Sequence, residues 1–493
     1  MRLTKTVGLL AGTTALTLSG VCFGNTDEAN TDALAQIAEL KAELAAMKAQ
    51  NGENWLTEQR ADQIRGIVQD VLADSETRSS LQSSGATAGY DNGFFISSAD
   101  GNFSMKINGL VQFRWIFNGS TGGGGTSGVT GGDYHDSWGF DVRRARVDFS
   151  GSMGQTWRYM LQLQYGSPFG YLGNGGVLPV VGPGAAAGGG IRPNLIGATG
   201  GAGNVNVLDA YVERDVELGG TEFSLRGGQF KAPFMREWLI DPGDLTTVDY
   251  SLLTYYFYQG YSTGLQLGYE SDTLRAAFAF TNGLNTPAQI YGLGSYDTSW
   301  TSNPTRYSFA GRVEYKMSGN WADFDDLNSR PGTEAGVMVG VAGFYQAYND
   351  NFTSLLAANT NVGGLTADVT WNFGGASLFA SLVWENASRA AGGTTNPWGF
   401  NVQGGYFLND DMEVFARYDY ANADTTGAEA TKLSVITLGM NYFVSTNARF
   451  TVDFGWSFND VGNLFGSAPS TGFAPASLIG SQYAIRTQLQ LSF

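Results

Sequence analysis

Hydrophobic and polar residues alternate along this chain from about residue 103 to its last residue. In the stretch LTADVTWNF, Leu365, Val369 and Trp371 share one side, and Asp368 and Asn372 lie on the other. A period of two residues is the period of a β-strand. An apolar outer face and a polar inner face are typical of strands with lipid outside and water inside. The pattern therefore predicts strands that cross a membrane.

Sixteen segments show this alternation. They are residues 103–117, 140–151, 157–165, 205–217, 221–230, 261–269, 274–281, 307–315, 335–346, 364–373, 376–386, 398–407, 412–420, 433–443, 448–458 and 483–493. An even number of strands lets both ends of a closed antiparallel barrel lie on the same side of a membrane. The predicted fold class is all-β, a transmembrane antiparallel β-barrel of about 16 strands within residues 90–493.

The gaps between these strands are short and long in turn. ELGG, ESD, FGG, LNDD and VSTN occupy short positions, and long glycine-rich segments follow the first and third strands. This alternation is expected when short turns face the periplasm and long loops lie outside the cell. One gap in a short position, KMSGNWADFDDLNSRPGTE, is much longer than the others.

The first residues have the features of a secretory signal. In MRLTKTVGLLAGTTALTLSGVCFG, Arg2 and Lys5 precede an apolar stretch that ends in small residues. This arrangement predicts a signal peptide over residues 1–24. Cleavage there would remove Cys22, the one cysteine of the chain. We therefore expect neither a disulfide nor thiol chemistry in the mature protein.

A helical segment is predicted between the signal and the barrel. Residues 27–80 are rich in Ala, Glu, Gln, Asp and Leu and poor in aromatic residues. Ile37, Leu40 and Leu44 follow one another at spacings of three and four, as in a heptad repeat. The pattern predicts a periplasmic α-helical segment over residues 25–85, either a short coiled coil or an ordinary amphipathic helix.

Composition excludes several other classes of protein. Charged residues make up 15% of the chain, against about 25% in ordinary globular domains. No run of about 18 apolar residues follows the N-terminus, so helical membrane spans are not expected. The net charge of −17 argues against nucleic acid as a partner.

Two motifs that could suggest chemistry are given no role. GYSTG at residues 260–264 matches a hydrolase nucleophile motif, but the one histidine, His135, lies in a glycine-rich loop. No enzyme is therefore expected. Asp323, Asp325 and Asp326, in the long gap at a short position, could hold Ca²⁺ or form a solvated acidic turn. We expect the solvated turn, with no metal and no cofactor.

Basic residues gather on the polar side of the predicted strands, where they would face the lumen. They are Lys106, Arg114, Arg144, Arg146, Arg158, Arg226, Arg275 and Arg312. Guanidinium groups in an aqueous pore lower the barrier to anions. The alternative is that these groups pair with carboxylates of neighbouring strands and stiffen the wall. The candidate partners are Asp148, Asp209, Glu213 and Glu314.

The segment 230–260, which follows the fifth predicted strand, is too apolar for a freely solvated loop. We expect it to fold into the lumen as a constriction; the alternative is that it packs over a neighbouring subunit. A sixteen-stranded barrel is wide enough for water, so whatever narrows it controls what passes. The charged residues of the segment are Lys231, Arg236, Glu237, Asp241, Asp244 and Asp249.

Three stretches resemble the phosphate-selective porins O and P. They are FDVRRARVDFSG (140–151), DAYVERDVELGGTEFSLRGGQFKAPFMREWL (209–239) and AFAFTNGLN (277–285). The resemblance implies a trimeric sixteen-stranded porin, general or anion-preferring, with an inward-folded third loop. It also extends the family's arginines to Arg144 and Arg146.

The chain ends in YAIRTQLQLSF, with Phe493 as its last residue. A terminal aromatic residue on a final strand resembles the assembly signal of outer-membrane proteins. The resemblance implies that the outer-membrane assembly machinery is a partner of this chain.

These observations predict an outer-membrane porin. We expect a homotrimeric, water-filled channel, surrounded by outer-membrane lipid, for passive diffusion of small hydrophilic solutes and ions. Four lysines follow residue 89, too few for the lysine-rich phosphate sites of the family. The alternative is a structural or adhesive outer-membrane barrel that is tethered through its helical N-terminus and has a plugged lumen.

Overall fold

The chain divides into two compact units, Met1–Ser84 and Gly85–Phe493. The computed structural model describes residues 38–43, 45–46, 65–66, 86–121, 136–154, 156–165, 205–283, 305–348, 359–389, 393–424, 431–461, 471–473 and 480–493.

The first unit is helical at each of its described residues, 38–43, 45–46 and 65–66. The predicted signal peptide and most of the predicted heptad positions, Leu44 among them, lie outside the described residues. No helix in the described part of the chain is long and apolar enough to span a membrane.

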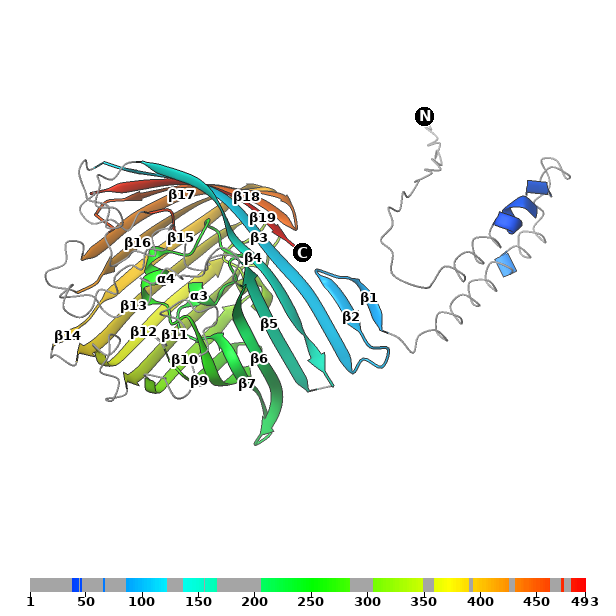
Figure 1. Cartoon of the computed structure of the whole chain (residues 1–493), viewed down its shortest axis with the longest axis horizontal. Coiled ribbons are helices and arrows are strands. Elements are labelled where there is room, and N and C mark those ends of the chain that lie inside the picture. The colour runs from blue at the N-terminus through cyan, green and yellow to red at the C-terminus, as the bar shows by residue number, and fades with distance from the viewer. Residues whose placement is uncertain are drawn as a thin grey trace, which may run out of the picture. The chain divides into compact units, whose positions relative to one another are not determined.

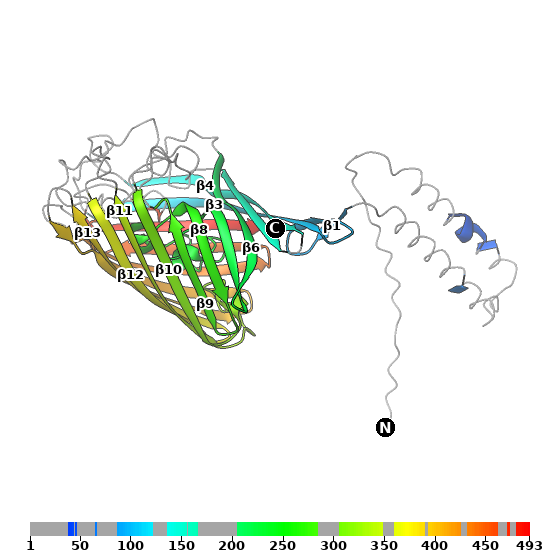
Figure 2. The same ribbon diagram turned by 90° about the horizontal axis from the view of Figure 1, so that it is seen from below.

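The second unit is built on one antiparallel sheet that closes into a barrel (Figures 1 and 2). Among the described residues, sixteen strands form its wall: β3 (Phe103–Ser120), β4 (Ser137–Met153), β5 (Trp157–Tyr165), β6 (Val205–Leu218), β7 (Thr221–Lys231), β8 (Tyr261–Glu270), β9 (Leu274–Thr281), β10 (Thr305–Ser318), β11 (Gly336–Tyr348), β12 (Asn359–Asn372), β13 (Ala376–Arg389), β15 (Trp398–Asn409), β16 (Met412–Asn422), β17 (Lys432–Ser445), β18 (Ala448–Ser457) and β19 (Gln482–Ser492). Neighbours in sequence pair along the wall, and β19 pairs with β3 to close the ring. The prediction of a sixteen-stranded antiparallel barrel is confirmed.

Connections of two kinds alternate around the ring. The turn end of the barrel carries short connections, such as residues 271–273 between β8 and β9 and residues 373–375 between β12 and β13. The loop end carries the longer ones. Residues 319–335, between β10 and β11, lie at the turn end and include the 3-10 helix η3 (Trp321–Phe324). We call this segment the long turn.

The two faces of the wall differ as the alternation predicts. Outward hydrophobic side chains such as Phe140 and Leu365 are 64% and 62% exposed in the isolated chain, which is the face that meets lipid in such barrels. Inward polar side chains such as Arg114 and Arg486 are each 1% exposed. Something inside the ring must therefore cover them.

Over Arg486 lies Thr471, whose carbonyl accepts a hydrogen bond from that guanidinium at 2.6 Å. Much of the remaining cover is provided by residues 232–260, which connect β7 to β8 and lie within the ring in Figure 1. We call this segment the inner loop; it contains the short helices α3 (Arg236–Leu239) and α4 (Leu252–Phe257). Most of its apolar side chains are buried, and the ring of Phe234 meets that of Phe344 on β11 edge to face at 4.9 Å. Helix α4 packs against β15 and β16.

A hairpin that the sequence did not predict precedes the barrel. It consists of β1 (Thr87–Tyr90) and β2 (Phe94–Ser97), and β2 pairs with residues 104–107 of β3 at the turn end. The sheet thus begins before residue 90, the predicted start of the barrel. A third additional strand, β14 (Thr394–Thr395), pairs with β13.

The last residue of the chain packs against β3. The backbone N–H of Phe493 donates to the Gly109 carbonyl at 3.1 Å, and the Gly109 N–H donates to the Phe493 carbonyl at 2.9 Å. The aromatic ring lies directly over Gly109, where an added β-carbon would stand 2.2 Å from a ring atom. The same ring meets Phe94 of the hairpin at 6.1 Å. Only glycine at position 109 leaves room for this closure.

We expect Gly109→Ala to displace the Phe493 ring and to destabilise the closed barrel by about 1–3 kcal/mol, the usual cost of overpacking. The measurement is the temperature at which the folded barrel loses its faster migration in an SDS gel. Gly139→Ala on β4 is the matched control, because a β-carbon there meets nothing within 4 Å. Equal transition temperatures for the two variants would contradict the prediction.

Candidate functional site

Two consecutive arginines of β4 enter the lumen because the strand is bulged. Gln112 on β3 is opposite Arg144, whereas the next residue, Phe113, is opposite Val142. Arg143 is therefore the extra residue of a β-bulge, a device that redirects a side chain. Arg143 and Arg144 are 3% and 2% exposed. Strict alternation would have pointed Arg143 at lipid.

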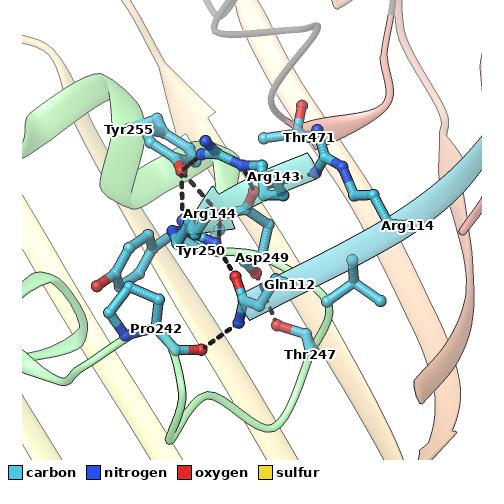
Figure 3. A network of polar contacts seen from close by, with 12 residues as sticks. Gln112, Arg114, Arg143, Arg144, Pro242, Thr247, Asp249, Tyr250, Tyr255 and Thr471 are labelled. Carbon is cyan, nitrogen blue, oxygen red and sulfur yellow. Dashed lines mark hydrogen bonds and ion pairs between the residues drawn. The ribbon is translucent and has the colours of Figure 1, made fainter. Parts of the chain in front are cut away.

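Asp249 of the inner loop lies at the centre of a cluster of guanidinium groups (Figure 3). Its carboxylate oxygens are 2.6 Å from Arg143 Nε, 2.8 Å from Arg144 Nη2 and 3.3 Å from Arg114 Nη1. The Tyr255 hydroxyl donates to the same carboxylate at 2.8 Å. Burial alone would raise the pKa of Asp249, but the three guanidinium groups outweigh it and hold that pKa well below its usual range.

Glu237 joins the two helices of the inner loop to the wall. Its carboxylate accepts hydrogen bonds from the Ser251 backbone N–H at 3.0 Å and from the Thr254 hydroxyl. The Ser251 hydroxyl also accepts a bond from the Thr254 N–H at 2.9 Å and so caps α4. On the wall side, Glu237 lies 3.5 Å from Arg417 Nη1 of β16. One carboxylate thus fixes α3, α4 and the wall together.

Backbone carbonyls of the inner loop are held by inward amide side chains. The amides of Gln112, Asn441 and Gln490 donate to the carbonyls of Pro242, Thr246 and Gly243 at 3.0, 2.8 and 2.9 Å. These three side chains come from β3, β17 and β19. The inner loop is therefore bonded to the wall from β15 through β19 to β4.

The opposite part of the wall, from β5 to β10, bounds a cavity of about 810 Å³ beneath the inner loop. The basic residues that line it are Arg158, Arg226, Lys231, Arg236, Arg275 and Arg312. The acidic residues that line it are Asp209, Glu213, Asp215, Glu222, Asp241, Glu270 and Glu314. Six basic and seven acidic residues give this cavity a nearly balanced charge.

Each arginine predicted to face the lumen has a carboxylate neighbour or an amide partner. Glu213 lies 2.8 Å from both Arg158 and Arg226. The remaining pairs are Arg275 with Glu270 at 2.8 Å, Arg312 with Asp368 at 2.7 Å, Arg114 with Asp141 at 2.7 Å, and Arg146 with Gln164 at 2.7 Å and Asp241 at 3.3 Å. Glu213 and Glu314 were among the partners that the sequence offered for such pairing.

The other predicted site residues lie in different surroundings. Lys231 donates to the Ile240 carbonyl at 3.1 Å, and Arg236 approaches Glu314 at 3.4 Å. Asp244 lies where the inner loop meets the long turn. Lys106 lies apart from the rest, opposite Phe95 of the hairpin.

Three arginines that the sequence analysis did not select also take part. Arg143 was missed because a bulge leaves no trace in an alternating pattern. Arg417 donates to the Thr247 hydroxyl at 2.6 Å, and Arg486 forms a two-bond pair with Asp453 at 2.6 and 2.7 Å. Both occupy polar positions of late strands, so extending the search for inward arginines to the whole barrel would have found them.

A closed antiparallel barrel of sixteen strands, with an apolar outside and a polar interior, defines a porin of an outer membrane. The chain belongs to the family of phosphate-selective porins O and P, whose model matches residues 125–463. It is therefore a channel rather than an enzyme, and its location is an outer membrane. No curated protein matches the chain.

The chain is also similar to solved outer-membrane proteins, at low identity. The anion-selective porin from Comamonas acidovorans is 14% identical over 79% of this chain and 100% of its own, with a TM-score of 0.48. OmpF of Salmonella typhi in complex with daunomycin is 12% identical over 82% and 100%, with a TM-score of 0.48. The outer-membrane channel DcaP of Acinetobacter baumannii is 11% identical over 83% and 100%, with a TM-score of 0.47.

We expect Asp249→Asn to destabilise the protein by roughly 3–5 kcal/mol, because it leaves the buried guanidinium groups of Arg143 and Arg144 without their counter-charge. The measurement is the thermal transition of the folded barrel at pH 7. Asp411→Asn, in the exposed turn between β15 and β16, is the control. A loss no larger than that of the control would contradict the prediction.

The ion pairs of Asp249 also predict how the stability of the protein depends on pH. Because the pKa of Asp249 is depressed in the folded protein, its contribution is complete above the ordinary value of 3.8 and is lost as the pH falls further. We therefore expect the stability difference between the native protein and Asp249→Asn to be constant from pH 9 to about pH 5 and to shrink at lower pH. A difference that already shrinks near pH 7 would contradict this.

Proposed function

We propose that the protein is a passive diffusion channel for small hydrophilic solutes and ions and that the inner loop is its constriction. The observation that carries this proposal is the cavity of about 810 Å³ between the inner loop and strands β5 to β10, which is lined by charged and polar side chains. A solute that crosses the barrel would follow this side, because the inner loop occupies the other.

The firm attachment of the inner loop supports a fixed aperture. Its contacts include the Asp249 cluster, the Glu237 links and the three amide bonds to backbone carbonyls. Loops held by buried ion pairs and helix caps do not move freely with the solvent. We infer an aperture of constant size rather than a loop that opens for each solute.

The charge on the cavity lining bears on ion preference. The side chains of Arg158, Arg226 and Arg275 are 46%, 25% and 27% exposed, so their guanidinium groups can meet passing anions. Their carboxylate partners reduce the net field in the same place. We propose an anion preference that is weak and that does not amount to phosphate specificity.

The family and the fold support a proposal about assembly and orientation. We propose a homotrimer with its turn end toward the periplasm, as short turns face in such barrels. We also propose that residues 25–85 lie in the periplasm. Recognition of Phe493 by the assembly machinery and contact of the apolar outer face with lipid belong to the same proposal.

The test is the current through the purified protein in a planar bilayer under a KCl gradient, with and without added phosphate. We expect a stable open conductance, a weakly anion-selective reversal potential and little block by phosphate. No conductance from folded barrels would overturn the channel proposal and favour a plugged, structural barrel. A clear cation preference would keep the channel and discard the anion preference.

We expect Glu213→Gln to raise the ratio of chloride to potassium permeability by roughly fivefold. It removes the carboxylate shared by Arg158 and Arg226, and a unit charge at about 4 Å in water is worth about 1 kcal/mol. Glu217→Gln is the matched control, because it removes the same charge from the same strand outside the cavity lining. The same change in selectivity for both variants would show that the cavity is not the path of the ions.

A further inference from the structure

The long turn, residues 319–335, is buried to an extent that a solvated connection at the turn end would not show. Phe324 and Ser329 are 0% exposed, and Leu327 is 2% exposed. Antiparallel strands need only two to five residues to reverse direction, and the neighbouring residues 271–273 and 373–375 are of that kind. The additional residues of the long turn are therefore used for packing.

The long turn crosses the mouth of the barrel from one side of the wall to the other. At one side, Trp321 Nε1 donates to the Ser271 carbonyl at 2.8 Å, and the Arg275 guanidinium lies over the Trp321 ring at 4.2 Å. At the other side, the Arg330 guanidinium lies over the ring of Phe443 on β17 at 4.2 Å. The segment thus connects the turn between β8 and β9 to β17.

Between these two attachments the long turn touches the inner loop directly. The Leu327 N–H donates to the Asp244 carbonyl at 3.2 Å, and the Thr246 hydroxyl donates to the Leu327 carbonyl at 3.1 Å. The Asn328 side-chain amide donates to the Asp244 carbonyl at 3.4 Å, and Arg236 bonds to the Phe324 carbonyl. We call this set of contacts the loop–turn junction.

We propose that the long turn is a second size-determining segment of the channel, which supports the inner loop from the periplasmic side through the loop–turn junction and so fixes the width of the aperture. The inference rests on the proposed function, in which the inner loop is the constriction. It assigns a role in selectivity to a connection that lies at the end of the barrel opposite the loops.

Glycines at the two ends of the segment allow this inward course. Gly319 and Gly332 have φ values of 87° and 88°, a region that favours glycine. At Gly319 an added β-carbon would also stand 2.9 Å from the backbone of Gly336. The chain can therefore bend sharply where it leaves β10.

The loop–turn junction also brings carboxylates of like charge together. Partial burial, together with the neighbouring carboxylate of Asp244, raises the pKa of Asp326 to about 7. The charged groups around the pair are Asp241, Lys231, Asp325, Arg330, Glu413 of β16 and Arg449 of β18. Because this pKa is raised in the packed state, the junction is most stable below about pH 4 and loses stability progressively as the pH rises from about 4 to about 7.

The first test compares Leu327→Asp with Ala322→Asp, an identical new side chain at an exposed position of the same turn. Leu327→Asp places a charge against the inner loop, so we expect its single-channel conductance in KCl to rise about twofold and larger neutral sugars to enter liposomes faster. Ala322→Asp should match the native channel. Native conductance and native sugar exclusion in a folded Leu327→Asp channel would overturn the inference and leave the proposed function intact.

A native protein that passes no current would instead overturn the proposed function, so the two failures are distinguishable. Should Leu327→Asp not fold, the pH dependence decides. We expect the conductance of the native channel to rise between pH 5.5 and 8.5 and that of the isosteric variant Asp326→Asn to rise less. A native profile as flat as that of Asp326→Asn would overturn the inference.

Discussion

The absence of water in the membrane core is the constraint on which this structure depends. Every backbone N–H and carbonyl of a membrane-spanning strand must find its partner within the sheet, because lipid offers none. The pairing of β19 with β3 satisfies this constraint by removing both free edges. The length of the strands, the outward hydrophobic side chains and the fit of Phe493 over Gly109 all serve that closure.

Closure of the barrel also places charged side chains in its interior, where they are stabilised by ion pairs. A ring of sixteen strands that is apolar outside must place its polar residues inside, and buried charges are stable only when they are paired. The inner loop brings Asp249 and Glu237 to arginines of β3, β4 and β16. Where the inner loop does not reach, acidic residues of the wall itself, such as Glu213, provide the pairing. Because the inner loop fills the side of the lumen next to β15–β19, β3 and β4, the cavity remains on the other side, beside β5 to β10.

Much of this architecture follows from the sequence because its cause is local. The strands are visible in the alternation, since lipid and water impose opposite requirements on successive residues. The apolar content of residues 230–260 indicated a loop that avoids solvent. The bulge at Arg143, the hairpin of β1 and β2, and the contact between Leu327 and Asp244 are different in kind. Each of these features depends on a contact with another segment of the chain. Neither the periodicity of hydrophobic residues nor the local composition indicates which segment that is.

The closing contact also governs how the barrel can form. Gln112 on β3 donates a hydrogen bond to Gln490 on β19 at 2.9 Å, across a sequence separation of 378 residues. Such distant pairing makes folding slow, because the entropy of closing a large loop is lost before the contact is gained. Until the last strand has paired with it, the first strand has an open edge that can pair with other chains. An incomplete chain is therefore an aggregation hazard and not merely an inactive channel.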